Sequence, residues 1–200
     1  MTRPYTIGAP SQGFSFEASS HTYIDNATGE VLPSITQLLE AAGLVDSTWY
    51  SEDSRERGTA VHDLCAQFDL GSLNPAMCWS PYKPYLMAHV AAMGILKLEI
   101  LAVEEPLAHP TLRYAGRPDR ILSIGGVKGC YELKTGKPEP AHCVQTAAQA
   151  VLISAELNIP AEMLARFACY LKPNGRFHVE RHTNRQDFDR WMKVLRECCG

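Results

Sequence analysis

Two acidic residues and a lysine beside a Gly-Gly pair form the most informative group in the sequence. Asp119 precedes Gly125-Gly126, and Glu132 and Lys134 follow it. Gly-Gly between two apolar-rich runs predicts a two-residue hairpin turn, because such turns need positive φ at their central positions. A turn at 125–126 places Asp119 opposite Glu132 and Arg117 opposite Lys134. Residues two apart on a strand share a face, so Glu132 and Lys134 point the same way.

Such a patch of two carboxylates with one or two cations has a recognisable chemistry. Hard oxygen ligands hold a divalent ion, and a lysine steadies an attacking water or a phosphate, as a magnesium-dependent phosphodiesterase requires. A cross-strand salt-bridge ladder fits equally well, with Arg117 and Lys134 neutralising Asp119 and Glu132. A register slip of one residue would move every side chain to the other face.

In these residues the chain resembles the PD-(D/E)XK nuclease superfamily, and within it the phage and RecB-like exonuclease branch. Pro118-Asp119, twelve intervening residues and Glu132-Leu133-Lys134 match its core motif. Gly58 to His62 is similar to an upstream G-x-x-x-H helix motif, and Val103 to Leu107 is similar to a strand with an additional acid. Gln145 is similar to the start of a Q-x-x-x-Y motif, and His21 to Leu39 is similar to the amino-terminal stretch of small phage members. The resemblance covers about residues 20–182.

The resemblance implies a role for each matched residue. The catalytic residues would be Asp119, Glu132, Lys134 and Gln145. The ligands of a Mg²⁺ or Mn²⁺ ion would be His62, Asp119, Glu132 and the Leu133 carbonyl. Glu104 or Glu105 would hold or orient a second ion, although a solvated charge pair explains them equally well.

Some of these residues also have plain structural interpretations. A lone histidine beside an apolar helix stripe, as His62 is, is commonly a core or boundary residue. His142, Gln145 and Gln149 recur at helical spacing, which an ordinary amphipathic helix also produces. Gln149 stands where the family often has Tyr, and Ala66 stands where an acid is common.

Charge along the chain predicts where a polyanion would bind. The net charge is −3, which argues against a uniformly basic surface. Residues 1–70 carry ten acids against three arginines, whereas 166–196 carry eight cations against three acids, with Tyr170 and Phe177 interleaved. The latter suits a DNA backbone track, which includes Arg166, and a solvated charged helix is the alternative. The predicted nucleic-acid contacts are Arg117, Thr135, Lys137, Lys172, Arg176 and Arg181.

The elements expected to position these residues indicate an α/β fold. We predict strands within 14–32 and 112–134, a hairpin over 164–181, and helices over 35–42, 57–70, 82–101, 141–157 and 186–198. Ser34 and Gln37 form a capping box for the first helix. The expected architecture is a central mixed sheet flanked by helices, the restriction-endonuclease-like core that the resemblance implies, with a small amino-terminal hairpin-and-helix subdomain.

The length of 200 residues fits a single domain with three parts: a subdomain over 1–56, a core over 57–182 and a terminal helix over 183–200. The seven scattered cysteines predict reduced thiols, and no signal-peptide pattern or membrane-length apolar run occurs in the sequence. We therefore expect a cytoplasmic protein, in the host cytoplasm if it is phage-encoded.

The function expected from this resemblance is a Mg²⁺- or Mn²⁺-dependent DNA exonuclease of phage recombination or repair type. Its partner would be DNA with a free end, and a single-strand annealing protein is a second candidate partner. A site-specific endonuclease on the same fold and a catalytically idle accessory or binding protein are the alternatives. The intact set of Asp119, Glu132 and Lys134 argues against the idle protein, because a pure binder has no need of these mutually constraining charges.

Overall fold

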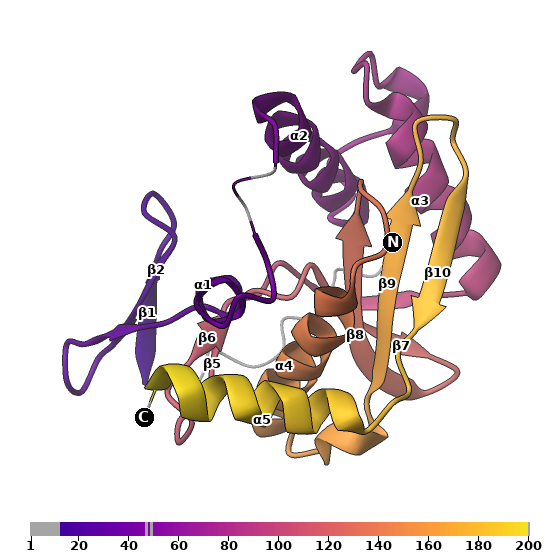
Figure 1. The fold of residues 1–200 in the computed structure, drawn as a ribbon. Coiled ribbons are helices and arrows are strands. Elements are labelled where there is room, and N and C mark those ends of the chain that lie inside the picture. The colour runs from indigo at the N-terminus through magenta and orange to yellow at the C-terminus, as the bar shows by residue number, and fades with distance from the viewer. Residues whose placement is uncertain (1–12, 47, 49, 200) are drawn as a thin grey trace.

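The computed structural model describes residues 13–46, 48 and 50–199. Among them a five-stranded mixed sheet forms the centre, with strand order β10-β9-β8-β7-β4 (Figure 1). Neighbouring strands are antiparallel except β8 and β9, which are parallel. The strands of this sheet are β4 (Glu99–Val103), β7 (Arg120–Ile124), β8 (Val127–Lys134), β9 (Ala165–Leu171) and β10 (Phe177–Arg181).

Helices cover both faces of this sheet. One apolar cluster joins side chains of α1 (Ile35–Ala41), α4 (Pro140–Leu157) and α5 (Gln186–Cys199) to one face, which includes Ile121. A second cluster joins α2 (Glu52–Asp69) and α3 (Lys83–Leu96) to the other face, which includes Leu122. Adjacent residues of β7 thus point to opposite helical layers, as the strand period requires. The predicted mixed α/β fold is confirmed.

The β7–β8 hairpin has the predicted turn and register. Gly125 and Gly126 adopt φ values of 56° and 85°, a conformation that glycine adopts without steric cost. The ladder runs from Ile124 opposite Val127 to Arg120 opposite Tyr131. Asp119, the residue before β7, therefore lies across from Glu132.

A parallel crossover completes the sheet beside this hairpin. After β8 the chain forms α4, passes through the short helix η3 (Ala161–Met163) and returns as β9 next to β8. The predicted β9–β10 hairpin is confirmed. Because α4 packs on β8 and β9, its side chains face the residues of β8 that point to the same layer.

An antiparallel subdomain lies beside the core. It contains β1 (Phe14–Glu17), β2 (Thr22–Asp25) and β3 (Val31–Leu32), followed by α1 with the predicted Ser34–Gln37 capping box. The Ala115 amide donates to the Pro33 carbonyl at 2.9 Å, which ties the subdomain to the pair β5 (Leu107–Ala108) and β6 (Ala115–Gly116). Residues 1–12 of the predicted subdomain lie outside the described residues.

The helix predicted over 82–101 is partly wrong. In the structure α3 ends at Leu96, Lys97 adopts a left-handed φ of 51°, and Glu99 begins β4, which pairs with β7. The apolar residues of 98–101 extend the helical stripe in sequence, and short apolar runs fit a helix and a strand alike. The second predicted helix begins earlier than expected, at Glu52, where Ser51 provides the amino-terminal cap.

Two further findings bear on the chemical setting of the fold. All seven cysteines lie among the described residues and are free thiols, in agreement with the prediction. Within the described part of the chain, every helix is too short or too polar to span a bilayer.

Candidate functional site

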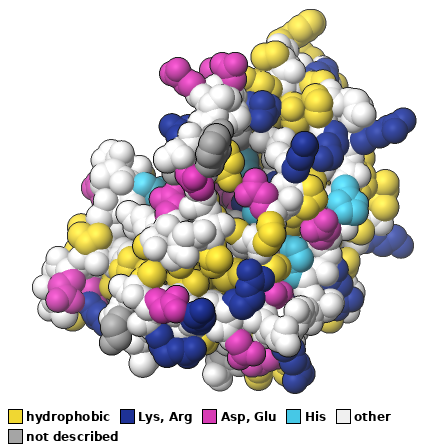
Figure 2. All heavy atoms as spheres, viewed as in Figure 1, with side chains coloured by type: hydrophobic (Ala, Val, Ile, Leu, Met, Phe, Trp, Pro, Cys, Tyr) yellow, Lys and Arg dark blue, Asp and Glu magenta, His cyan; other side chains and the backbone are white. Residues whose placement is uncertain are grey.

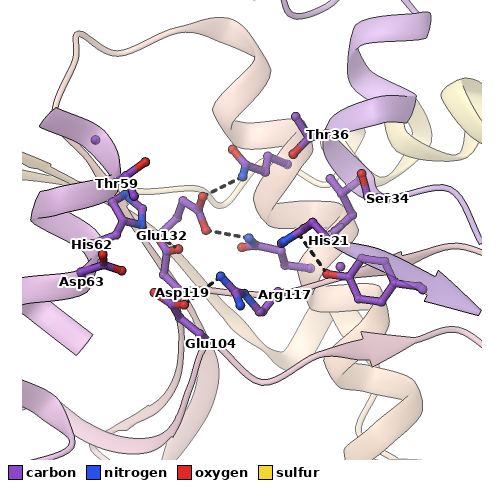
Figure 3. A pocket seen from close by; sticks show the side chains of 16 residues that line it. His21, Ser34, Thr36, Thr59, His62, Asp63, Glu104, Arg117, Asp119 and Glu132 are labelled. Atoms are coloured by element: carbon purple, nitrogen blue, oxygen red, sulfur yellow. Dashed lines mark hydrogen bonds and ion pairs between the residues drawn. The ribbon is translucent and has the colours of Figure 1, made fainter. Parts of the chain in front are cut away.

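A cleft of about 360 Å³ opens at the carboxyl end of β8. Figure 3 shows His62 on the α2 side, His21 of the amino-terminal subdomain on the opposite side, and Glu132 between them. Asp119, Glu104, Arg117 and the two glutamines of α4 also line it, and further polar side chains of the lining include Ser34, Thr36, Thr59 and Asp63. The structure therefore brings residues from well-separated parts of the sequence around the predicted acid pair.

Glu132 accepts hydrogen bonds from three side chains. Lys134 Nζ and Gln145 Nε2 donate to its Oε1 at 3.0 and 2.7 Å, and Gln149 Nε2 donates to its Oε2 at 2.6 Å. Lys134 Nζ also donates to Gln145 Oε1 at 2.9 Å. The carboxylate is 4% exposed, so this network fixes its position.

Gln149 is a site residue that sequence reasoning did not assign. The sequence places it at helical spacing with Gln145 and marks it as a departure from the family pattern, but assigns it no role; in the structure its amide donates to Glu132 from the helix turn after Gln145. Spacing of four residues on α4 was the available signal, because such residues lie on one helix face. Gln149 Oε1 is buried without a hydrogen-bond partner among the described residues.

Asp119 is held by two groups. The Leu133 amide donates to Asp119 Oδ2 at 2.7 Å, and His62 Nδ1 lies 3.1 Å from Asp119 Oδ1. Burial alone would raise the pKa of Asp119. The nearby cations His62, Lys134 and Arg120 outweigh burial and lower this pKa to about 2. At neutral pH the carboxyl group is therefore ionised.

The cations of the site respond in the opposite direction. Burial lowers the pKa of His62, but the Asp119 and Glu132 carboxylates more than compensate and raise it overall. The pKa of Lys134 is also raised, because Glu132 and Asp119 outweigh the effect of burial. The carboxylates thus favour the charged forms of both side chains.

A buried ionic cluster supports Asp119 from the other face of the sheet. Asp69 of α2 pairs with Arg120 and with His89 of α3, whose Nε2 lies 3.0 Å from each Asp69 oxygen. Arg120 also donates to the backbone carbonyl of Asp119. The three side chains are at most 1% exposed and link both helices to the start of β7.

Of the two acids proposed for a second ion, only Glu104 lines the cleft. Its Oε2 lies 2.9 Å from Arg117 Nη2, and its backbone has a positive φ of 48°. Glu105 lies outside that lining, and burial raises its pKa. Arg117, expected opposite Lys134 in a salt-bridge ladder, instead pairs with Glu104 across the cleft mouth, so only the Lys134–Glu132 part of that ladder forms.

A second cleft, of about 240 Å³, adjoins the first at His62, which lines both. It contains Lys134 and the predicted nucleic-acid contacts Thr135 and Lys137, together with Arg55 and Arg57 of α2. The Nε atom of Arg57 is buried and has no hydrogen-bond partner among the described residues. The concentration of cations makes this cleft suitable for anions.

The remaining predicted nucleic-acid contacts lie apart from both clefts. Lys172 and Arg176 flank the β9–β10 turn, where the Lys172 amide bonds the Arg176 carbonyl at 2.9 Å. Arg181 lines a third hollow, of about 110 Å³, beside Arg166. The structure does not bring these three contacts into the first two clefts.

The predicted basic track is wrong at two of its members. Arg166 is 3% exposed and pairs with Asp187 at 2.9 Å, with its guanidinium carbon 4.7 Å from the centre of the Phe188 ring. Tyr170 is fully buried, so its ring cannot stack on a nucleotide. β9 is an inner strand of a sheet that helices cover on both faces, so all of its side chains are buried, which a simple count of charges and aromatics ignores.

The donor set of the first cleft suits a divalent cation that prefers oxygen. Asp119 and Glu132 supply ionised or hydrogen-bonded carboxylates, and Gln149 Oε1 is an oxygen acceptor with no hydrogen-bond partner in the part of the chain that the structure describes. The Leu133 side chain packs in the core, and its amide is on Asp119, so only its carbonyl is available as the predicted ligand. Three or more His, Cys, Asp or Glu side chains do not gather into one metal-binding group among the described residues.

Comparison with known proteins does not identify a family. A scan against protein-family models gives no match, and a search of curated proteins finds no significant similarity.

Proposed function

We propose that the chain is a metal-dependent deoxyribonuclease of the PD-(D/E)XK type, and that it degrades DNA from an end. The observation that carries this proposal is the convergence of Asp119, Glu132 and Lys134 at the end of β8, with His62 beside them. The antiparallel β7–β8 pair, the α4 crossover and the parallel β9 also agree with the restriction-endonuclease-like core that the resemblance implies.

In this proposal the residues of the first cleft have separate roles in metal binding, in positioning of the water and in support of Glu132. Asp119, Glu132, His62 and the Leu133 carbonyl would hold Mg²⁺ or Mn²⁺, which when bound lowers the pKa of water and offsets charge on the phosphate. The Lys134 ammonium, fixed by Glu132 and Gln145, orients the attacking water or a phosphate oxygen. Gln145 and Gln149 hold the Glu132 carboxylate in place and thereby preorganise the site.

The surroundings of the site support a nucleic acid as substrate. A strand over Asp119 and Glu132 would pass His62 into the second cleft, where Lys137, Arg55 and Arg57 offer cations to its phosphates. The subdomain residues His21 and Tyr23 wall the first cleft opposite α2, which favours a strand end over an uninterrupted duplex.

The proposal is tested with labelled linear duplex, linear single strands and closed circular DNA, each with Mg²⁺, Mn²⁺ or a chelator. We expect metal-dependent loss of linear DNA only, and loss of activity by about a hundredfold or more in Asp119→Asn and Lys134→Ala. Lys128→Ala is the matched control, because Lys128 is exposed at the turn end of β8, opposite the end that carries Lys134. Wild-type cleavage by either site variant would exclude the proposed active site, and cutting of circles would indicate an endonuclease.

One observation favours a second function, that of a catalytically idle binding protein. Each carboxylate oxygen of Asp119 and Glu132 already accepts a hydrogen bond within the protein, so the network is satisfied without a metal ion. This function predicts DNA binding without products in every metal tested. A single-strand annealing protein as partner, and a role in phage recombination or repair, belong to the exonuclease proposal and depend on it.

A further inference from the structure

A lobe outside both clefts exposes two large apolar side chains. Trp79 is 92% exposed and Met77 is 66% exposed, and both lie in the segment that joins α2 to α3. Met77 ends the short helix η2 (Pro75–Met77), two residues before Trp79. A tryptophan is usually buried over most of its surface, and neighbouring exposed apolar side chains commonly mark an interaction site.

The chain segments that form this lobe carry charges of one sign. Residues 70–98 contain no Asp or Glu but include Lys83 and Lys97, and residues 163–179, which contain Lys172 and Arg176, also lack acids. The β9–β10 turn adjoins the start of α3, since a Cβ atom on Gly175 would lie 3.8 Å from the Pro84 carbonyl oxygen. In Figure 2 hydrophobic and basic side chains gather in the upper right, where Figure 1 shows α3 and the β9–β10 turn.

The lobe lies at the same end of the sheet as the candidate site. β8 and β9 are parallel, with Lys134 opposite Tyr170, so Lys172 extends beyond the end of β8 that carries Lys134. The two strands are about 4.8 Å apart. A nucleic acid that leaves the second cleft on this side therefore meets the β9–β10 turn before it meets α3.

We propose that this cationic lobe, formed by Met77, Trp79, Lys83, Lys172 and Arg176, binds single-stranded DNA by stacking an unpaired base on Trp79. Every base offers a π face, and flanking cations attract the phosphates, so such a surface is tolerant of sequence. A duplex hides those faces within its stack, so the tryptophan distinguishes single strands from duplex. The inference rests on the proposed function in that it names the strand form of the substrate.

The first test measures binding of a labelled oligonucleotide by fluorescence anisotropy, with a chelator present to prevent cleavage. We expect Trp79→Ala to weaken single-strand binding by about fivefold or more, with less than about a twofold effect on the same sequence in a duplex. Trp79→Phe retains an aromatic face and should lose less. Met163→Ala is the matched control, because Met163 is 67% exposed at the end of η3, at the opposite end of β9 from the β9–β10 turn.

A second measurement separates stacking from charge. Lys172→Ala and Arg176→Ala should each reduce the slope of log Kd against log salt by about 0.7 for single strands, and Lys128→Ala at the other end of β8 should leave it unchanged. Subtracting the fluorescence of Trp79→Phe from that of the wild type gives the emission of Trp79. This emission should be quenched as single strands are added. Thermal unfolding of each variant shows that the fold is retained.

Several outcomes would overturn the inference. One is an affinity for single strands that Trp79→Ala leaves unchanged, and another is an equal loss of affinity for single strands and duplex in that variant. A third is that Trp79→Ala loses binding to a protein partner but keeps its affinity for DNA. Cleavage is measured separately. If Trp79-dependent binding persists in a protein that cuts no DNA with any metal, the nuclease proposal fails and the binding surface stands.

Discussion

Glu132 shows how much of the candidate site depends on side chains that are neutral. Its carboxylate is nearly buried, and its partners are one lysine and two glutamines of α4. A buried carboxylate without such donors would be protonated or would destabilise the fold. The two glutamines therefore supply hydrogen-bond donors to the buried Glu132 carboxylate without adding any charge of their own.

Truncating Gln149 tests this directly. In Gln149→Ala the Glu132 Oε2 atom loses its donor, and we expect the free energy of unfolding to fall by about 1–3 kcal/mol. Urea denaturation measures the loss. Thr59→Ala is the matched control, because Thr59 lines the same cleft but lies on the exposed face of α2. A fall no larger than that of the control would mean that the Gln149 contact does not support Glu132.

His142 predicts a dependence of stability on pH. Burial, with smaller contributions from Lys134 and His182, lowers the pKa of His142 to about 3. Between pH 3 and 6.5 the unfolded chain therefore binds a proton that the folded protein does not, and stability falls as the pH is lowered. Between these two pH values this group alone contributes a loss of roughly 1 kcal/mol for each pH unit.

Comparison of wild type with His142→Gln isolates this effect, because contributions of the other histidines cancel in the difference. Denaturant unfolding at pH 7.5 and pH 5 should show a smaller loss of stability in the variant. Equal losses in the two proteins would contradict the low pKa of His142.

At the level of elements, local signals in the sequence predicted the site hairpin better than they predicted the helices around it. Gly125-Gly126 fixed the turn, and with it the register that sets Asp119 across from Glu132. The helix expected over 82–101 was too long, because only pairing with β7 makes the apolar residues after Lys97 a strand. Contacts between distant segments decide such cases, and a single sequence does not display them.

The same distinction applies to the candidate site. Asp119, Glu132 and Lys134 were predictable because one hairpin and the strand period bring them together. The Asp69–His89–Arg120 cluster was not, because its members come from α2, α3 and β7 and meet only after the helices pack. Family resemblance, rather than spacing, was the basis for placing His62 at the site.

Gly129 tests the contact between the parallel strands. A Cβ atom at this position would lie closer to the Ala165 carbonyl oxygen than atoms can approach, and that oxygen belongs to the backbone of β9. We expect Gly129→Ala to lower the free energy of unfolding by about 3 kcal/mol or more, because the ladder must shift. Gly94→Ala on α3 is the control, since nothing lies within 4 Å of its Cβ position, and it should stabilise the protein by about 0.5–1 kcal/mol. Similar effects of both substitutions would show that β8 and β9 do not approach so closely.

At the scale of the whole molecule, the positions of the charged side chains say more about binding than the net charge does. The net charge of −3 gives no sign of a polyanion site, but the second cleft combines Lys134 and Lys137 with Arg55 and Arg57. Glu139 is the acid in the lining of this cleft, whereas Asp69 and Asp187 face inward as partners of buried cations. Local potential, not net charge, governs attraction of a strand to a cleft.

The salt dependence of DNA binding measures this arrangement. We expect Arg57→Ala and Lys137→Ala each to reduce the slope of log Kd against log salt for duplex DNA by about 0.9, measured with a chelator present. The exposed Lys128 provides the comparison, and Lys128→Ala should keep the wild-type slope. If the three variants shared one slope, DNA would not pass through the second cleft.

The order of strands in the sheet also determines when the site can form during synthesis. All the residues that line the first cleft lie between 21 and 149, yet β8, which carries Glu132, has no neighbour on one side until Ala165–Leu171 is made. The ribosome therefore releases every side chain that lines the cleft before it has made β9, the strand that pairs with β8. Assembly of the site is a late event, set by the last third of the chain rather than by the residues that do the chemistry.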